Sequence, residues 1–421
     1  MSALLGRVQQ AAGLLQKTSL LGQAGPAILY ASARGFAAEA EAGGIPVEVH
    51  NEGGSKRVVV TKELPGERWL KLLTQADCRV EVSKHPEVIT SKDTIKKLIG
   101  SQCDGVLGQL TEDWGSELFS ALQKAGGSTY SNYAVGFNNV DVGAATESKV
   151  SVGNTPGVLT ETTAELAVAL TMAAARRVVE ADSFMRAGKY EGWLPTLFVG
   201  ALLQNKTVGI IGAGRIGAAY ARMMSEGHKM DIVYYDPYPS KKLEEYMKGY
   251  GELLKSQGER PVTCTRVETM EEVFKAGDVV SLHCALDEKT KHLADKKMLG
   301  MMKEDAILIN AARGPIHHEE DLVAHLKANP NFRCGLDVFE DEPHMKPGLA
   351  DCANAVIVPH IASASQWTRS GMATLAAANI AGRLQDFPVW DKPDMLPFVD
   401  GPFDQIPKAS PNILNAKDLG L

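Results

Sequence analysis

The sequence lacks the features of several large classes of protein. Its six cysteines include no Cys-x-x-Cys pair, so neither a disulfide framework nor a cysteine zinc site is indicated. The net charge of −7 argues against a nucleic-acid partner. The longest uncharged apolar run, residues 166–175, is too short to cross a bilayer, so we expect no membrane partner. With 421 residues, 44% of them hydrophobic, the chain can form two globular domains.

The N-terminal segment lacks acidic residues. No Asp or Glu precedes Glu39, whereas Arg7, Lys17 and Arg34 are spread among Ala, Leu, Gln and Ser. This composition is typical of an organelle transit peptide, and "ARGFAA" is similar to a mitochondrial processing site. The chain ends in "KDLGL" and not in Ser-Lys-Leu. We therefore expect a transit peptide over residues 1–38 and a mitochondrial location, with the chloroplast as the alternative.

From residue 45 onward, short β-branched runs alternate with helical stretches. Runs such as "KRVVVT", "DGVLG", "TVGII", "DVVSLHC" and "NAVIVPHI" predict buried strands. This alternation indicates an α/β protein with two Rossmann-like or flavodoxin-like domains built on parallel sheets. We expect a discontinuous substrate domain, residues 45–156 and 361–421, with a dinucleotide-binding domain, residues 157–360, inserted in it. The stretch 159–189 predicts one long helix.

A glycine-rich motif lies at the start of the second domain. In "VGIIGAGRIG", Gly212, Gly214 and Gly217 form Gly-x-Gly-x-x-Gly between a predicted strand and a predicted helix, the context that a dinucleotide requires. Asp236 follows 19 residues after Gly217, where an acid can bind ribose hydroxyls and repel a 2′-phosphate. The motif therefore favours NAD(H) over NADP(H). A methyltransferase that uses S-adenosylmethionine could share the loop and the acid.

Polar side chains follow three further predicted strands. Arg313 comes after "AILIN", Asp337 and Glu342 after "FRCGL", and His360 after "AVIV". Because ligands of open α/β sheets bind at the carboxyl ends of the strands, we expect these residues to share one crevice with the glycine-rich loop. A charged Arg, a carboxylate and a His in that place indicate catalysis and argue against the methyltransferase alternative.

The stretch "HHEED", which begins at His317, suggests a metal site at first sight. The His-Glu-x-x-His motif would need a histidine at position 322, where Leu322 stands. We therefore expect no metal and interpret His317 and His318 as the solvated start of a helix.

The sequence resembles the D-isomer-specific 2-hydroxyacid dehydrogenases, and within them the plant-type hydroxypyruvate reductases. The motifs that carry the resemblance extend over the chain from about residue 46 to its end. They are "GQLTEDW", "SNYAVGFNNVDV", "VGNTPGVLTETTAELA", "YEGWLP", "VGIIGAGRIGAAYARMM", "NAARGP", "GLDVFEDEPHMKPGLAD" and "VPHIASAS". The chain departs from the family in having "HHE" where "IDE" is frequent, and Ala285 or Cys284 where a proline is common.

The resemblance implies roles for individual residues. Arg313, Glu342 and His360 would be catalytic, with His360 as the proton donor. The backbone amides of Val135 and Gly136 would bind the substrate carboxylate, and Trp193 would reach into the partner's site of a homodimer. The implied cofactor-binding residues are Gly212, Gly214, Arg215, Ile216, Gly217, Asp236, His283, Ala311, Asp337 and Ser363.

The expected activity is reduction of hydroxypyruvate to D-glycerate by NADH, as in photorespiration, with glyoxylate as a further substrate. Phosphoglycerate dehydrogenase is an alternative within the family, although the residues beyond Pro393 are too few for a regulatory domain. Formate dehydrogenase is disfavoured because its family members carry Gln at the position of Glu342. An NAD-sensing corepressor, which acts by binding partners, is the alternative from another class.

Overall fold

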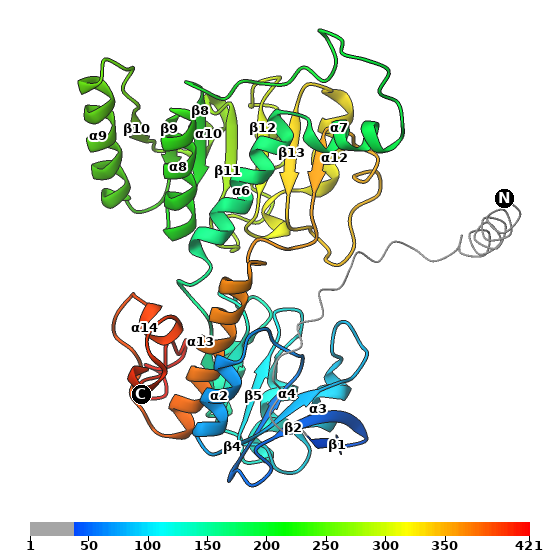
Figure 1. The fold of residues 1–421 in the computed structure, drawn as a ribbon, viewed down its shortest axis with the longest axis vertical. Coiled ribbons are helices and arrows are strands. Elements are labelled where there is room, and N and C mark those ends of the chain that lie inside the picture. The colour runs from blue at the N-terminus through cyan, green and yellow to red at the C-terminus, as the bar shows by residue number, and fades with distance from the viewer. Residues whose placement is uncertain (1–37) are drawn as a thin grey trace, which may run out of the picture. The chain divides into compact units, whose positions relative to one another are not determined.

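The computed structural model describes residues 38–421, which contain two seven-stranded sheets (Figure 1). In the first sheet the order is β1-β2-β4-β3-β5-β6-β7; β1, β2 and β4 pair antiparallel and the others pair parallel. The predicted α/β class is confirmed, with an N-terminal antiparallel hairpin that the sequence did not predict. The predicted leader lies outside the described residues except for Ala38. The strands are β1 (Ala38–Ala42), β2 (Ile45–His50), β3 (Lys56–Val60), β4 (Cys78–Ser83), β5 (Gly105–Gly108), β6 (Thr129–Asn132) and β7 (Ser151–Gly153).

The second sheet is parallel throughout. Its order is β10-β9-β8-β11-β12-β13-β14, so the chain reverses its direction of travel next to β8, where the glycine-rich turn follows. Its strands are β8 (Thr207–Ile211), β9 (Asp231–Tyr235), β10 (Cys264–Arg266), β11 (Val279–Leu282), β12 (Ile307–Asn310), β13 (Arg333–Leu336) and β14 (Ala355–Ile357).

Helices cover both faces of each sheet because successive strand side chains point to opposite faces. Val58 and Val60 pack in the core that includes α2 and α13, whereas Val59 packs in the core of α3 and α4. All three valines are fully buried, and each contributes about 1.5–3 kcal/mol to stability. The helices around this sheet are α2 (Arg68–Gln75), α3 (Lys92–Ile99), α4 (Ser116–Lys124), α5 (Val142–Glu147), α13 (Gln366–Leu384), α14 (Leu396–Val399) and the 3-10 turn η2 (Phe403–Gln405).

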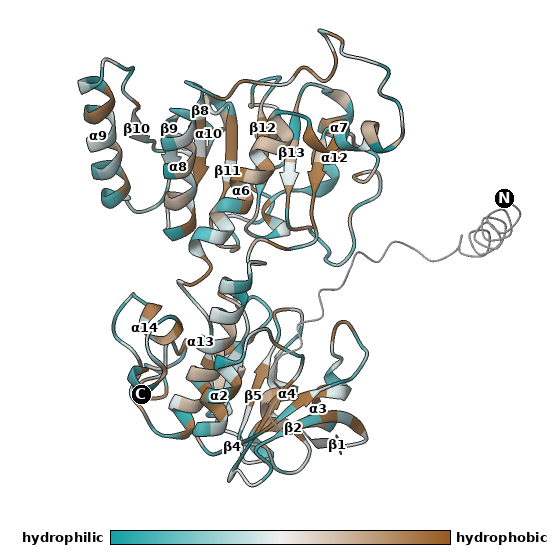
Figure 2. Ribbon diagram, viewed as in Figure 1, coloured by the Kyte–Doolittle hydropathy of each residue, from teal (hydrophilic) through white to brown (hydrophobic). Residues whose placement is uncertain are grey.

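The second sheet is covered in the same way. Ile210 packs with α6, α8 and α9, and its neighbour Ile211 packs with α10 and α12. In Figure 2, β11 is hydrophobic, while α9 shows hydrophobic and hydrophilic residues on different sides, as expected of a surface helix. The helices are α6 (Thr160–Ala175), α7 (Val178–Arg186), α8 (Arg215–His228), α9 (Lys241–Ser256), α10 (Met270–Ala276), α11 (Lys296–Leu299), α12 (Glu319–Ala328) and the 3-10 turn η1 (Gly314–Ile316).

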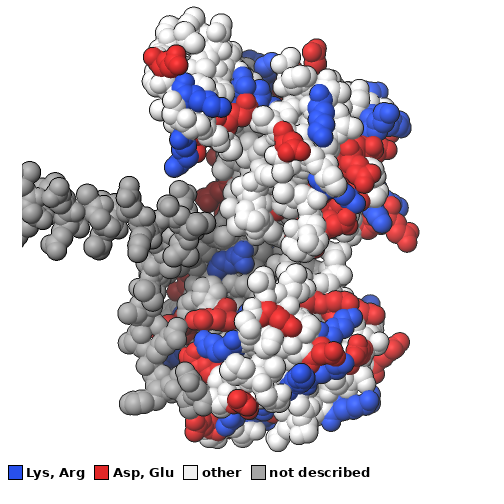
Figure 3. Space-filling model, turned by 90° about the vertical axis from the view of Figure 1, so that its right-hand side faces the viewer, with Lys and Arg blue, Asp and Glu red and all other residues white. Residues whose placement is uncertain are grey.

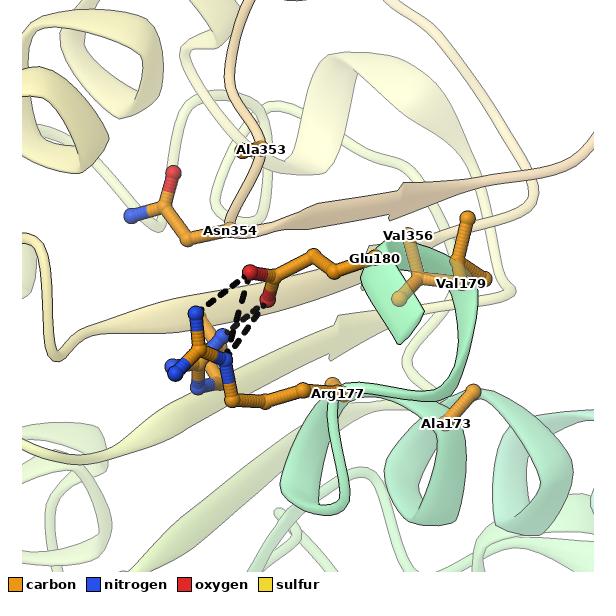
Figure 4. Close-up of a pocket in the computed structure, with 9 residues that line it drawn as sticks. Ala173, Arg177, Val179, Glu180, Ala353, Asn354 and Val356 are labelled. Carbon is orange, nitrogen blue, oxygen red and sulfur yellow. Dashed lines mark hydrogen bonds and ion pairs between the residues drawn. The ribbon is translucent and has the colours of Figure 1, made fainter. Parts of the chain in front are cut away.

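The helix predicted over residues 159–189 is wrong as one element, because the chain breaks between α6 and α7. Arg177 has a left-handed backbone with φ of 55°, which ends the helical path. Its guanidinium pairs with Glu180, which also binds Arg333, so the break is fixed by an ion-pair cluster (Figure 4). The break depends on the ion pair between Glu180 and Arg333, the first residue of β13. Because Arg333 lies 153 residues beyond Glu180, the sequence around Arg177 does not predict the break.

The described surface mixes charges of both signs. On the face in Figure 3, acidic and basic side chains are interspersed without a continuous basic patch. Within residues 38–421, no helix combines the length and the apolar character that a membrane span requires.

Candidate active site

The glycine-rich turn joins β8 to α8, and its three glycines differ in what surrounds them. Gly212 has φ of 92°, and a Cβ there would lie 2.7 Å from the Cys284 backbone nitrogen. A Cβ at Gly217 would lie 2.0 Å from the Gly212 carbonyl oxygen, so only glycine lets α8 pack on the turn. A Cβ at Gly214, the N-cap of α8, would meet no other atom within 4 Å and would lie in open space. The amides at the start of α8 can therefore face an anionic group.

Arg215 and Ile216 begin α8 beside this space. Arg215 is exposed, whereas Ile216 is half-buried and packs against hydrophobic residues of both sheets' cores. The first turn of α8 is thus anchored by Ile216 while the side chain of Arg215 stays accessible.

Asp236 directly follows β9, and its carboxylate closes the glycine-rich turn. One oxygen accepts the Ala213 amide at 2.9 Å and the other accepts the Tyr238 amide at 2.9 Å. Arg266, at the end of β10, donates to the Asp236 carbonyl oxygen at 3.0 Å. The sequence around Asp236 does not predict this cation, because Arg266 lies 30 residues beyond the acid and is brought there by the pairing of β10 with β9.

His283 and Ala311 follow the neighbouring strands β11 and β12. His283 Nε2 lies 2.8 Å from Ser281 Oγ, its ring lies against Tyr220, and its Cβ touches the Gly217 position. Burial lowers the pKa of His283 to about 3, so its ring is neutral at neutral pH. Ala311 is buried at the end of β12.

Two backbone amides after β6 remain open. The amides of Val135 and Gly136 donate to no acceptor within residues 38–421, whereas both carbonyl groups are occupied: Val135 O accepts Asn154 Nδ2 at 2.8 Å and Gly136 O accepts Asn132 Nδ2 at 3.0 Å. A pair of free amides beside a cation can bind a carboxylate.

Arg313 supplies that cation. A Cβ at Gly136 would lie 1.5 Å from Arg313 Nη2, so the guanidinium touches the glycine backbone, and Arg313 Nε lies 3.4 Å from Asn138 Oδ1. Asn310 Nδ2 donates to the Arg313 carbonyl oxygen at 2.9 Å and fixes the turn after β12. Burial lowers the pKa of Arg313 and the charge of Glu342 opposes this shift; a guanidinium still stays charged near neutral pH.

Asp337, fully buried after β13, organises the loop that contains His360. Its carboxylate oxygens accept the amides of Ile361 at 2.6 Å and Ala362 at 2.9 Å, and its carbonyl oxygen accepts the His360 amide at 3.0 Å. Burial raises the pKa of Asp337 although these amides and His360 oppose the shift. Ser363 follows on the same loop and is half-buried.

Glu342 and His360 form a hydrogen-bonded pair. His360 Nδ1 lies 2.8 Å from Glu342 Oε2, and the Phe339 amide donates to Glu342 Oε1 at 3.0 Å. Burial raises the pKa of Glu342, but the hydrogen bond and charge of His360 outweigh burial and hold it below the ordinary value. The pair is half-buried, with 29% of the His360 side chain exposed, so His360 Nε2 can meet a substrate. His360 has φ of 51°, a strained backbone of the kind found at functional sites.

The structure thus brings Arg313 to Gly136 and His360 to Glu342 and Asp337, but Trp193 stands apart. Its side chain is 79% exposed on the segment after α7. Within the described part of the chain, no three His, Cys, Asp or Glu side chains gather into a cluster that could hold a metal ion.

His317 is not solvated, so that prediction is wrong. It is fully buried and its Nδ1 lies 2.9 Å from Asn310 Nδ2. Burial lowers its pKa to about 4. His318 is the N-cap of α12, where its Nδ1 accepts the Asp321 amide. The 3-10 turn η1 directs His317 inward. The apolar pattern of the helix that follows, α12, does not predict this burial.

The cavity in Figure 4 lies at the amino ends of strands of the second sheet, whereas the candidate active site lies at their carboxyl ends. Arg333 begins β13 and Asn354 precedes β14, so this cavity adjoins the amino ends of the strands. Its two arginines both bind Glu180, which compensates one of their two positive charges. The catalytic candidates all follow carboxyl ends.

Comparison with known proteins identifies the family. The NAD binding domain of the D-isomer specific 2-hydroxyacid dehydrogenases matches residues 168–362. A glycerate dehydrogenase of Cucumis sativus is 61% identical over 377 residues, 89% of this chain and 98% of that protein. The peroxisomal glycerate dehydrogenase of Arabidopsis thaliana is 59% identical over 378 residues, 90% of this chain and 98% of that protein. A crystal structure of a Thermus thermophilus protein has a TM-score of 0.70 and 33% identity, and the match covers 85% of this chain and 99% of that one.

The chain therefore belongs to the D-isomer specific 2-hydroxyacid dehydrogenase family and is an NAD-dependent oxidoreductase. The glycine-rich turn fits this cofactor, because open space adjoins Gly214 at the start of α8 and the acid Asp236 closes the same turn.

Two glycine substitutions in this turn should separate folding from cofactor binding. Gly214→Ala adds a methyl group to open space, so the melting temperature should stay near wild type while NADH affinity falls about tenfold, because the backbone must approach a pyrophosphate. Gly217→Ala should lower stability by about 1–3 kcal/mol through collision with Gly212. Thermal unfolding and NADH fluorescence titration measure both effects. Equal loss of stability in the two variants would contradict this assignment.

Proposed function

We propose that the protein reduces hydroxypyruvate to D-glycerate with NADH, and reduces glyoxylate to glycolate as a secondary activity. The observation that carries the proposal is the His360–Glu342 pair at the carboxyl edge of the nucleotide-binding sheet. The close relatives named glycerate dehydrogenase support the choice of substrate.

Arg313 and the amides of Val135 and Gly136 bind the substrate carboxylate. A guanidinium provides a permanent charge on a forked set of donors, which matches a carboxylate. Because Gly136 touches Arg313, one small anion can contact both. The carbonyl group of the 2-oxo acid, next to this carboxylate, is then polarised by the same positive charge.

His360 donates the proton that the reduced carbonyl oxygen requires. Glu342 accepts the Nδ1–H of the ring, which orients the imidazole and leaves Nε2 to deliver a proton to the substrate oxygen. Asp337 holds the loop so that the ring stays on Glu342.

NADH, when bound, supplies the hydride to the carbonyl carbon. Residues of the glycine-rich turn (Gly212, Gly214, Arg215, Ile216 and Gly217) would hold its pyrophosphate and Asp236 its adenosine ribose. Residues at the other strand ends (His283, Ala311, Asp337 and Ser363) would hold its nicotinamide half.

A substrate panel tests the function directly. NADH oxidation should be followed with hydroxypyruvate, glyoxylate, pyruvate and phosphohydroxypyruvate. We expect the highest kcat/KM for hydroxypyruvate and the next for glyoxylate. A preference for phosphohydroxypyruvate would favour phosphoglycerate dehydrogenase, and NADH binding without turnover of any substrate would favour a corepressor-like binding protein.

The proton-donor assignment predicts a loss of turnover without a loss of cofactor binding. His360→Asn should lower kcat about 10²–10⁴-fold without changing NADH affinity, because the ring that donates the proton is lost. Glu342→Gln should also lower kcat, because a neutral amide holds the His360 ring less firmly than a carboxylate does. Steady-state turnover and NADH fluorescence titration measure both effects, and a His360→Asn variant that keeps the wild-type kcat would contradict the assignment.

We further propose a homodimer. No residue of α7 is buried, and the following segment exposes large apolar side chains, a pattern that marks an interaction surface. The exposed residues are Val178, Val179, Met185, Tyr190, Trp193, Leu194, Val199 and Leu202.

Light scattering should give about two 45.2-kDa chains per particle before removal of any leader. Trp193→Ser with Leu194→Ser should give monomers; a wild-type monomer would refute the proposal.

We also propose that residues 1–38 direct the protein to mitochondria, on the basis of their composition. A fluorescent protein fused to residues 1–45 should be imported into mitochondria, and replacement of Arg7, Lys17 and Arg34 by Gln should abolish import. Import of the fusion into chloroplasts would establish the alternative location, and a cytosolic fusion would refute both.

A further inference from the structure

We propose that Asn154 is a positioning residue that aims the amides of Val135 and Gly136 in the loop after β6, which we call the carboxylate loop. The C-terminal segment that contains Asn412 holds Asn154 in place. The inference rests on the proposed function, which puts the substrate carboxylate at the amides of Val135 and Gly136. Asn154 directly follows β7 and is 4% exposed.

Two peptide planes determine where these amides point. The Val135 amide shares a plane with the Ala134 carbonyl, and the Gly136 amide shares a plane with the Val135 carbonyl. In a trans peptide, the C=O and N–H bonds point in opposite directions. The Ala134 carbonyl oxygen accepts the Thr155 amide at 2.9 Å, and the Val135 carbonyl oxygen accepts Asn154 Nδ2 at 2.8 Å. Both carbonyl groups therefore face residues 154–155, and both amides face away from them.

These bonds matter because Gly136 has no side chain that restricts its backbone. A Cβ at Gly136 would also displace the Arg313 guanidinium. Among the described residues, Asn154 Nδ2 is the group that donates to the Val135 carbonyl, so its loss would leave the plane that contains the Gly136 amide without a hydrogen bond. Donors that are aimed before the substrate arrives bind an anion more strongly than donors that must reorient.

Asn154 is itself held by two other asparagines. Its backbone carbonyl oxygen accepts Asn379 Nδ2, from α13, at 2.9 Å, and its Oδ1 accepts Asn412 Nδ2. Asn379 Oδ1 in turn accepts the Asn412 amide at 2.8 Å. A chain of hydrogen bonds thus leads from the C-terminal segment through Asn154 to the carboxylate loop.

Asn415 provides a matched control. It lies three residues beyond Asn412 in the same segment and is 1% exposed. Its Oδ1 accepts the Val152 amide at 2.9 Å, and its Nδ2 donates to Val150 O at 2.9 Å. It therefore anchors the C-terminal segment to β7 without a bond to the carboxylate loop.

The experiment compares Asn154→Ala, Asn412→Ala and Asn415→Ala in the full-length protein. Oxamate, an analogue of a 2-oxo acid with the same carboxylate, is titrated into the enzyme–NADH complex. For each variant, the dissociation constants of oxamate and NADH and the melting temperature are compared with those of the wild type. In Asn154→Ala, we expect the oxamate constant to rise about tenfold and the NADH constant to change less than about twofold. Asn412→Ala should weaken oxamate about threefold, since Asn154 keeps its bond to Asn379.

Asn415→Ala should lower the melting temperature but leave oxamate binding within about twofold of wild type. The inference is overturned if Asn154→Ala binds oxamate as wild type does, or if Asn415→Ala weakens oxamate as much. If Asn154→Ala does not fold, the comparison of Asn412→Ala with Asn415→Ala decides in the same way. Failure of the wild-type enzyme to bind oxamate or to reduce any 2-oxo acid would instead refute the proposed function.

Discussion

The site depends above all on the buried carboxylate of Asp337 and the hydrogen bonds that it accepts from two backbone amides. These bonds to residues 361 and 362, together with the Asp337 carbonyl bond to the His360 amide, hold His360 in a left-handed conformation. A non-glycine residue adopts this conformation at a cost of about 1–2 kcal/mol. The three hydrogen bonds offset that cost and place Nδ1 on Glu342.

The electrostatics of the site follow from this placement. Glu342 interacts electrostatically with both His360 and Arg313, and both lower its pKa. Its single negative charge cannot neutralise two cations, so a net positive charge remains for an anionic substrate. The same carboxylate accepts the Phe339 amide, so it stays in place when the substrate is absent. The proton donor and the carboxylate receptor are therefore arranged before binding, which reduces reorganisation during the reaction.

The sequence predicts the parts of this site that depend on strand ends and on local motifs. The glycine-rich turn, Asp236 and the residues after β12, β13 and β14 were identified because each follows a recognisable apolar strand, and the comparisons confirm the fold and the family. His317 was misplaced because a 3-10 turn interrupts the helical period there. The break at Arg177 and the asparagine chain were missed for another reason: Asn154 and Asn412 are 258 residues apart and neither belongs to a motif.

The two halves of the site differ in how the chain builds them. The glycine-rich turn is local: Gly212, Gly217 and Asp236 lie close together in the sequence and pack around one turn. The carboxylate loop is not local, because its planes are fixed by residues after β7, in α13 and near the C-terminus. Closing such long loops costs entropy that the final packing must offset. The carboxylate loop therefore depends on residues from distant parts of the chain, whereas the glycine-rich turn is built within the consecutive elements β8 to β11.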